Sequence, residues 1–244
     1  MKSPIAPLLL LCAAIVVLTS MGCASGSGST GEKVYYATGK GAVTPDGLHR
    51  IKWEPFAVTF VKPGASLESY DAVLLDEVTI SYKRPPRTSV MPGDLDGMND
   101  NFALSSQATG YMKKYFHEAF AKELAQSNDF RVVDAPGPNV LRIAGHIVGL
   151  VITTPPQNDQ LPDESVYTSS PGEMTLVLNA EDSVTGEPLV RVGQRSDIGT
   201  GFDQFYESNP VANSGAVRQL FNKWAMALRR ELDQFKALKN IPEP

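Results

Sequence analysis

Cysteine is scarce in this sequence: Cys12 and Cys23 are the only two among 244 residues. Cys12 lies in an apolar leader that we expect to be removed, and Cys23 lies at the predicted cleavage point. The mature domain then holds no free thiol, no disulfide and no thiolate metal site. A cysteine nucleophile and a cysteine-based zinc site are therefore excluded.

Positive charge and long apolar runs are also scarce. Removing Lys2 with the leader leaves 21 Lys and Arg against 27 Asp and Glu, a net charge of −6. No basic patch stands out against that balance, so we expect no nucleic acid partner. After residue 23, no apolar run approaches the roughly 20 residues that cross a bilayer. The longest, residues 143–153, is interrupted by His146 and two glycines.

The leader itself is typical of export. Lys2 precedes an uncharged apolar run at residues 5–18, which has the length of a signal-peptide core. Cys23, preceded by Gly22 and followed by Ala24, resembles the lipobox of bacterial lipoproteins, although Ser20 stands where that motif usually has leucine. The resemblance implies acylation of Cys23. The alternative is ordinary cleavage after Ala24, which would release a soluble periplasmic protein.

These features predict three regions. Residues 1–22 form a lipoprotein signal peptide, residues 23–32 the lipidated cysteine and a flexible Gly/Ser tether, and residues 33–244 a single globular domain. Acyl chains on Cys23 would anchor this domain to a membrane. By resemblance to enterobacterial sorting, Ala24 rather than aspartate after the cysteine favours the outer membrane, with the domain in the periplasm.

The hydrophobic periodicity predicts an α+β fold. We expect strands at 71–82, 130–133, 140–154, 173–182 and 188–198, the long one at 140–154 being central, and amphipathic helices at 104–126 and 216–238. Residues 33–66 read as an irregular wrap with one strand, and 83–101, 155–171 and 199–215 as loops. This order predicts a two-layer sandwich: a mostly antiparallel sheet of about five strands with two helices on one face.

Several segments resemble a known family. They are 60–65 with 70–76, helix positions 115–120, 130–133 with 136–142, the turn at 180–187, and 221–225. In these turns and core positions the chain resembles the bacterial envelope lipoproteins of the domain of unknown function 3313 family, over roughly residues 55–238. The resemblance implies an envelope lipoprotein of unknown activity and supplies no catalytic residues.

Metal-binding patterns are weak. The only histidines are His49, His117 and His146, and nothing in the sequence brings them together with carboxylates as a metal site requires. Residues 94–100 are acidic, but their glycine is misplaced and the final glutamate of a calcium loop is missing. We therefore assign no metal site and no cofactor.

Catalytic patterns are equally weak. Residues 26–33 mimic a phosphate loop, but Glu32 breaks the motif and no strand precedes it. There is no Gly-x-Ser-x-Gly elbow. The carboxylate pairs at 76–77 and 181–182 should point to opposite faces of a strand, which is unsuitable for shared acid–base work. The basic segment 83–87 reads as a solvated turn, the alternative being contact with anionic headgroups. Cys23 is thus the only site residue assigned.

Two functional hypotheses follow, neither of them enzymatic. The first is a membrane-anchored binding or assembly module that presents its domain to an envelope protein, since long loops on a compact scaffold commonly carry recognition. The second is a carrier of a small hydrophobic or glycan ligand in a pocket between sheet and helices. The carrier hypothesis predicts a cavity of at least ~300 Å³.

Overall fold

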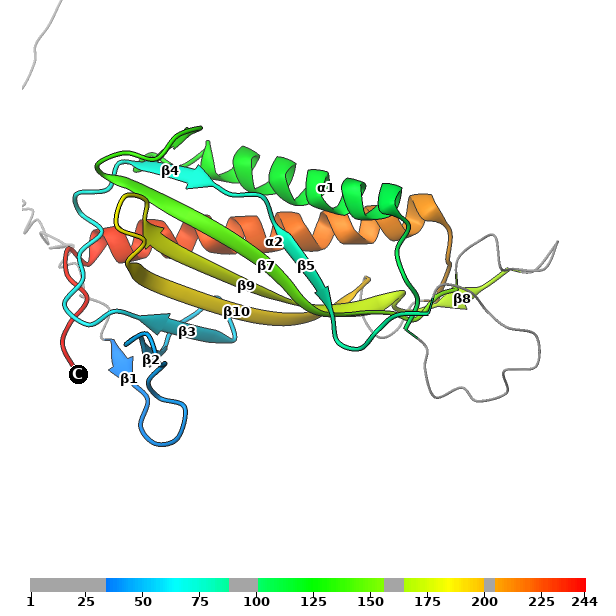
Figure 1. The fold of residues 1–244 in the computed structure, drawn as a ribbon, viewed down its shortest axis with the longest axis horizontal. Coiled ribbons are helices and arrows are strands. Elements are labelled where there is room, and N and C mark those ends of the chain that lie inside the picture. Colours follow the sequence, from blue (N-terminus) through cyan, green and yellow to red (C-terminus); the bar gives the residue numbers. More distant parts are fainter. Residues whose placement is uncertain (1–33, 88–100, 156–164, 200–204) are drawn as a thin grey trace, which may run out of the picture. The chain divides into compact units, whose positions relative to one another are not determined.

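The computed structural model describes residues 34–87, 101–155, 165–199 and 205–244. Two helices, α1 (Ser106–Leu124) and α2 (Pro210–Ala237), lie on one face of a large sheet (Figure 1). This confirms the α+β class and the placement of both helices on one face. The strands of the main sheet are β1 Tyr35–Tyr36, β2 His49–Lys52, β3 Val58–Val61, β4 Ala72–Leu75, β5 Thr79–Tyr82, β6 Arg131–Val133, β7 Val140–Ile152, β9 Gly172–Asp182 and β10 Pro188–Ile198.

The sheet is larger than the predicted five strands. It has nine, in the order β1-β2-β3-β10-β9-β7-β4-β6, with β5 also paired to β7. The main error lies in residues 33–66, where the structure has three strands rather than one. Each is two to four residues long, too short to produce a readable alternation. They extend the sheet because β3 pairs with the free edge of β10, a long-range contact.

The predicted single strand at 71–82 is also wrong. It is divided into β4 and β5, which pair in parallel with successive parts of β7. Leu75 lies opposite Ile143 and Thr79 opposite His146, so the 71–82 segment has one residue more than β7 between these two pairs. The extra residue interrupts the ladder in the manner of a bulge. The sheet is therefore mixed, with parallel pairing around β4, β5 and β6.

The centre of the sheet is as predicted. β7 lies between β9 on one side and β4 with β5 on the other, and β9 and β10 form an antiparallel hairpin. Asp182 Oδ1 accepts hydrogen bonds from the backbone N–H groups of Val184 and Thr185 at 3.0 and 2.7 Å. Gly186 has φ +72°, the left-handed conformation that favours glycine in such turns.

The two helices run in the same direction. Arg218, in the first third of α2, lies over the ring of Tyr115 at the middle of α1, whereas Ser127 donates a hydrogen bond to Asp233 (2.8 Å) just beyond the end of α1. Contacts that advance together along both helices require parallel axes. The N-terminal ends of α1 (Ser106–Leu124) and α2 (Pro210–Ala237) therefore lie at the same end of the domain.

Helix α2 begins six residues before its predicted start at residue 216. Asn209 is its N-cap and accepts a hydrogen bond from the Ala212 N–H at 2.9 Å, and Pro210 occupies the first turn. This is a standard start signal. The asparagine, serine and glycine at residues 213–215 made the segment resemble a loop. The predicted loop 155–171 also holds β8 (Tyr167–Thr168), and the predicted loop 199–215 holds β11 (Tyr206–Glu207). These two strands pair as a separate small sheet.

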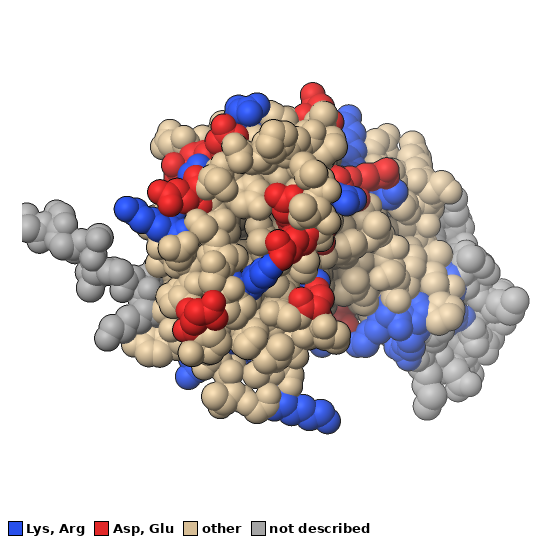
Figure 2. Space-filling view, turned by 60° about the vertical axis from the view of Figure 1, so that its left-hand side comes forward, with Lys and Arg blue, Asp and Glu red and all other residues tan. Residues whose placement is uncertain are grey.

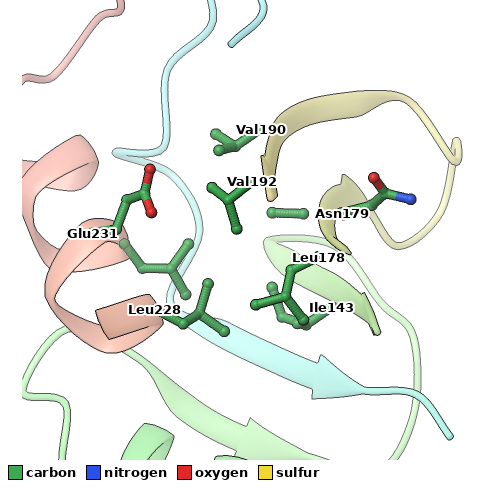
Figure 3. Close-up of a pocket in the computed structure, with 9 residues that line it drawn as sticks. Ile143, Leu178, Asn179, Val190, Val192, Leu228 and Glu231 are labelled. Carbon is green, nitrogen blue, oxygen red and sulfur yellow. The ribbon is translucent and has the colours of Figure 1, made fainter. Parts of the chain in front are cut away.

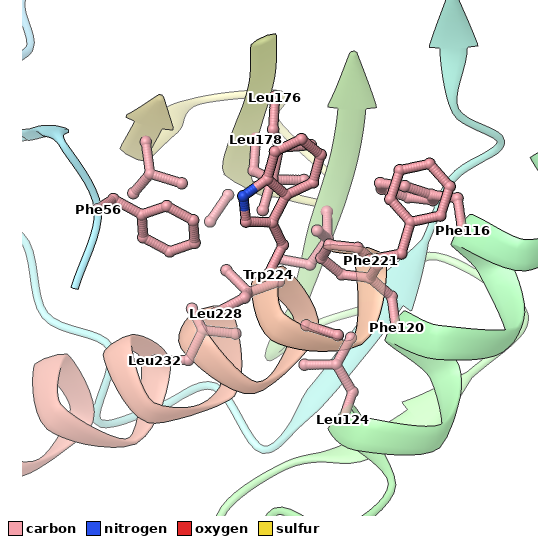
Figure 4. Packing of buried hydrophobic residues seen from close by; sticks show 14 of the residues in the cluster. Phe56, Phe116, Phe120, Leu124, Leu176, Leu178, Phe221, Trp224, Leu228 and Leu232 are labelled. Carbon is pink, nitrogen blue, oxygen red and sulfur yellow. The ribbon is translucent and has the colours of Figure 1, made fainter. Parts of the chain in front are cut away.

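The core fills the space between the helices and the sheet (Figure 4). Phe116 stacks on Phe120 and meets Phe221 edge-on, with ring centroids 4.1 and 5.5 Å apart. Gly145 of β7 lies beneath this cluster, and a Cβ added there would lie 2.6 Å from Phe116 Cζ. Because the described domain has a contiguous core of its own, we expect residues 32–244 to fold without the leader.

Candidate binding groove

The groups proposed from the sequence remain apart or lie outside the described residues. Three of these groups lie outside the described residues: Cys23, residues 26–33 and the acidic segment 94–100. His49 packs edge-on against Tyr36, and the Nδ1 of His146 is 2.8 Å from the Thr79 hydroxyl. Across the part of the chain that the structure describes, no three His, Cys, Asp or Glu side chains form a group able to hold a metal ion.

The two carboxylates of the 76–77 pair have different partners. Asp76 accepts a hydrogen bond from the Arg142 Nε at 2.6 Å, and Glu77 pairs with Lys113 of α1. The prediction that these two carboxylates lie on opposite faces of a strand is wrong, because both residues lie in the break between β4 and β5 and not in a strand. Each carboxylate has its own cation, so the pair is not arranged for shared proton transfer.

The basic segment 83–87 is tied to the fold. Lys83 Nζ pairs with Glu173 at 3.1 Å, and the Arg84 carbonyl accepts a hydrogen bond from the side chain of buried Asn101 at 2.8 Å. The Arg87 N–H donates to the Asn101 carbonyl at 2.7 Å. Elsewhere charges of both signs are interspersed, as on most of the face drawn in Figure 2. Neither described helix has an apolar stretch that would span a bilayer.

A groove of about 770 Å³ lies at the N-terminal ends of both helices. We call it the distal groove. Its walls come from the segment 102–105, the first half of α1, the first turns of α2 as far as Val217, and the far ends of β7 and β10. The apolar residues that line it are Phe102, Leu104, Tyr111, Met112, Tyr115, Ile152, Ile198, Val211 and Val217, with three prolines and two alanines.

Local sequence explains why the groove forms where it does. Ser105 caps α1 by accepting a hydrogen bond from the Ala108 N–H at 3.1 Å, and Asn209 caps α2 in the same way. Both caps line the groove, so the two helices begin at its edge. The parallel helices leave the end of the sheet uncovered there, since β7 and β10 extend to Ile152 and Ile198.

The groove carries no charge on its described lining. Its polar members are serine, threonine, asparagine and glutamine, although Asp, Glu, Lys and Arg make up 20% of the chain. Asn213 donates through Nδ2 to the Ser208 hydroxyl at 2.9 Å, while its Oδ1 is enclosed and has no hydrogen-bond partner among the described residues. Exposed apolar side chains lie at the rim: Val211 is 81% and Tyr111 48% exposed.

A second feature is a buried carboxyl group between α2 and the sheet. Glu231 is fully buried and faces Val190 and Val192 beside a cavity of only about 10 Å³ (Figure 3). Burial raises the pKa of Glu231 to about 8, against the opposing effect of the hydrogen bond from Thr59. The cavity beside Glu231 is far smaller than the ~300 Å³ that the carrier hypothesis requires, whereas the distal groove exceeds that volume. The available space lies at the end, in the distal groove.

Sequence reasoning missed both features. Residues 102–104 and 208–217, which line the groove, fell in or beside predicted loops. The signal that could have indicated the groove was the stretch 205–217, in which Glu207 is the one charged residue. Glu231 was missed because the sequence did not show that its side of α2 faces the sheet. Glu231 lies three positions after Leu228 and next to Leu232, so its helical spacing placed it on the same side of α2 as these apolar residues. That spacing could have indicated its burial.

The fold and the groove together define a two-layer α+β domain with an open hollow at one end. The chain belongs to the family described as protein of unknown function (DUF3313), whose model matches residues 48–228. This confirms the family resemblance drawn from the sequence. No curated protein matches the chain.

Several solved structures are similar to part of the fold. A PelC dodecamer from Paraburkholderia phytofirmans has a TM-score of 0.34 at 11% identity, covering 70% of this chain and 96% of that one. A protein from Helicobacter pylori assigned as a neuraminyllactose-binding hemagglutinin homologue scores 0.39 at 14%, covering 72% and 91%. A protein from Caulobacter crescentus assigned as a lipoprotein scores 0.25 at 14%, covering 70% and 91%.

Proposed function

We propose that this chain is a bacterial envelope lipoprotein, anchored through acyl chains on Cys23, and that its domain acts by binding rather than by catalysis. The distal groove carries the binding part of the proposal, because it offers an open, ligand-sized hollow. General acid–base catalysis needs ionisable groups near neutral pKa at the reacting atoms, whereas the described lining offers apolar surface and neutral hydrogen-bonding side chains.

The position of the groove supports this role. The first described strand lies beside the C-terminus, since the Tyr36 hydroxyl donates to the Pro242 carbonyl. The groove lies at the opposite end of α2, whose 28 residues span about 42 Å. The groove therefore lies at the end of the domain opposite to its first described strand. An anchor on the periplasmic face of the outer membrane would place the domain, and with it the groove, in the periplasm.

The anchor is tested by mass spectrometry of the mature N-terminus together with membrane fractionation. We expect the wild-type protein to begin at an acylated Cys23, to sediment with membranes and to need detergent for release. Cys23→Ser should abolish acylation. Cys12→Ser is the matched control and should behave as wild type, since Cys12 leaves with the leader. A native chain that begins at Ser25, or that washes off in buffer, would refute the anchor.

The binding role is tested with a photo-crosslinking amino acid at Val211 of the full chain in intact cells. Val184 is the control position, because it is 67% exposed in the β9–β10 turn and does not line the groove. Specific binding predicts adducts from position 211 that position 184 does not give. The same adducts from both positions, or none from either, would count against the groove as a binding site.

A further inference from the structure

We infer that the face of the main sheet turned away from the helices is an interface with a second copy of this chain, packed sheet against sheet about a two-fold axis. Both described helices lie on the opposite face (Figure 1). We call this surface the open sheet face. It shares no residue with the described lining of the distal groove, and its central residues are Val58, Phe60, Ala144, His146, Val148, Thr175, Val177 and Gly193.

The open sheet face carries apolar side chains where a water-facing sheet normally carries polar ones. Buried and half-exposed residues alternate along β9, so Leu176 and Leu178 face the helices and Val177 faces away from them. In an antiparallel sheet with one solvated face, the outward positions are normally polar. Five half-exposed apolar side chains instead lie on this face without packing against the buried core: Val58, Phe60, Ala144, Val148 and Val177.

A row of uncharged residues crosses five strands at the middle of this face. Thr79 of β5 lies opposite His146, and His146 lies opposite Val177. Val177 in turn lies opposite Gly193, and Gly193 lies opposite Val58. The row is low because it combines a glycine with short side chains. Such a surface suits a second sheet, since packed sheets approach to about 10 Å.

Charged residues of both signs border the uncharged row on each side. Arg142 pairs with Asp76 at one border, and Glu173 lies between Lys83 and Arg195 at the other. Two copies related by a two-fold axis can therefore place cations over carboxylates at both borders, although the whole chain has a net charge of −5. The remaining charged residues at these borders are Asp46, Glu181 and Arg191 on the first side and Asp197 on the second.

The area of the face is close to what a stable dimer needs. β9 and β10 each have 11 residues and β7 has 13, whereas β3 and β5 add four each. At about 3.3 Å per residue and about 4.8 Å between strands, these strands cover roughly 650 Å² in the plane of the sheet. The relief of the side chains adds to this value. Standard interfaces bury about 800 Å² on each partner.

An identical copy is the occupant that these features favour. A flat face of small side chains with mixed charges at both ends is matched by the same face turned through a two-fold axis, which is the commonest symmetry of protein dimers. Packing the two faces together removes the outward apolar side chains of both copies from water, and that burial favours association.

The test is sedimentation velocity of the domain of residues 32–244 between about 1 and 100 µM. Interfaces of standard size have micromolar or lower dissociation constants, so we expect a dimer to be populated at about 50 µM. Gly193→Arg should weaken the dimer at least about tenfold, because it places a charge in the uncharged row. A Cβ at this position meets nothing closer than 3.9 Å, so the monomer fold should tolerate the change.

Gly110→Arg in α1 is the matched control. The substitution is the same and its added Cβ also meets nothing within 4 Å, but it lies in the helix layer. We expect its dimer to remain within about twofold of wild type. Urea unfolding of both variants checks that the fold is intact.

A crosslinking experiment tests the two-fold axis without adding a charge. Residues 32–244 contain no cysteine, so Val177→Cys introduces a single thiol at the middle of the face. An axis through the face brings position 177 of both copies together, and a short bismaleimide should then give a covalent dimer. Val184→Cys, at a 67% exposed site in the β9–β10 turn, is the control and should remain monomeric.

The inference is overturned if the domain is monomeric at about 100 µM, if the two arginine variants behave alike, or if position 177 gives no covalent dimer. A photo-crosslinker at position 177 in intact cells that captures other proteins and no second copy would likewise overturn it. Failure of the crosslinking experiment at Val211 would count against the distal groove alone, because the two surfaces share no residue.

Discussion

Thr59 of β3 and Glu231 of α2, which lie 172 residues apart in the chain, meet inside the core. The Thr59 hydroxyl donates to Glu231 Oε1 at 3.2 Å, and both residues are fully buried. The second carboxyl oxygen has no hydrogen-bond partner among the described residues. A carboxyl group in this setting is favoured in its neutral form, because ionisation would place a charge among aliphatic side chains.

The stability of the domain should therefore depend on pH above the acid range. Burial raises the folded-state pKa of Glu231 to about 8 from an ordinary value of 4.5. The folded domain holds the proton more tightly, so this contribution to the free energy of unfolding is fully present below about pH 4.5 and is lost as pH rises through about 8. At about 1.4 kcal/mol for each pH unit, the loss is on the order of 5 kcal/mol.

Urea unfolding at about pH 5, 7 and 9, followed by fluorescence of buried Trp53 and Trp224, measures this dependence. Glu231→Gln keeps an acceptor for Thr59 and removes the titrating group, so its stability should be nearly level across this range. Glu118→Gln, at an exposed site on α1, is the control and should retain the wild-type slope. A Glu231→Gln variant with an unchanged slope would show that the carboxyl group is not the cause.

The close contact between Gly145 and Phe116 predicts a second effect. Gly145→Ala places a Cβ 2.6 Å from Phe116 Cζ, which forces the ring or strand β7 to shift. We expect a loss of about 1–3 kcal/mol in the free energy of unfolding, measured by urea denaturation. Gly110→Ala in α1 is the matched control, because nothing lies within 4 Å of its added Cβ. That variant should gain up to about 1 kcal/mol in helix propensity, and equal losses in both variants would contradict the argument.

The cap of α2 predicts a third effect. Asn209→Ala removes the side-chain acceptor for the Ala212 N–H and should cost about 1 kcal/mol of stability. Hydrogen exchange should quicken at the first turn of α2 more than at its middle. Asn209→Ser retains a capping oxygen and should restore most of the loss. If alanine and serine behaved alike, the cap would not be what stabilises this helix start.

The β9–β10 turn predicts an effect at acid pH. Asp182 receives hydrogen bonds from Val184, Thr185 and Tyr70, and the backbone hydrogen bond from Thr185 is the largest factor lowering the pKa of Asp182 below 3.8. Its contribution is present above that value and is lost as pH falls through the lowered pKa. Asp182→Asn should weaken the turn by about 1 kcal/mol at neutral pH and by less in acid. A deficit that stays constant down to about pH 2 would contradict this assignment.

Much of the fold could be predicted from local pattern. The helix at 106–124, the central strand β7 and the β9–β10 hairpin repeat apolar residues at helical or alternating spacing over ten or more residues. Short strands such as β2 and β3 carry no such signal. Their position depends on pairing with each other and with the distant edge of β10, which sequence periodicity does not record.

The distal groove could not be predicted from local sequence patterns either. The distal groove combines residues from 102 to 217 that meet only because two parallel helices begin at one end of the sheet. The predicted loop at 199–215 hid the first turns of α2, and with them the enclosed side chain of Asn213. Asn209 followed by Pro210 is a typical signal for the start of a helix, and it could have shown that α2 begins at residue 210 and not at residue 216.

The sequence by itself determined the pattern of an export signal, the scarcity of thiols, the acidic balance, the family and the α+β class, because these depend on composition and on neighbours within a few turns or strands. Only the tertiary structure decided that Glu231 is buried against Thr59 and that a groove opens at the helix starts. Burial and hollow space arise from which distant surfaces face each other, and that is settled by packing of the whole chain.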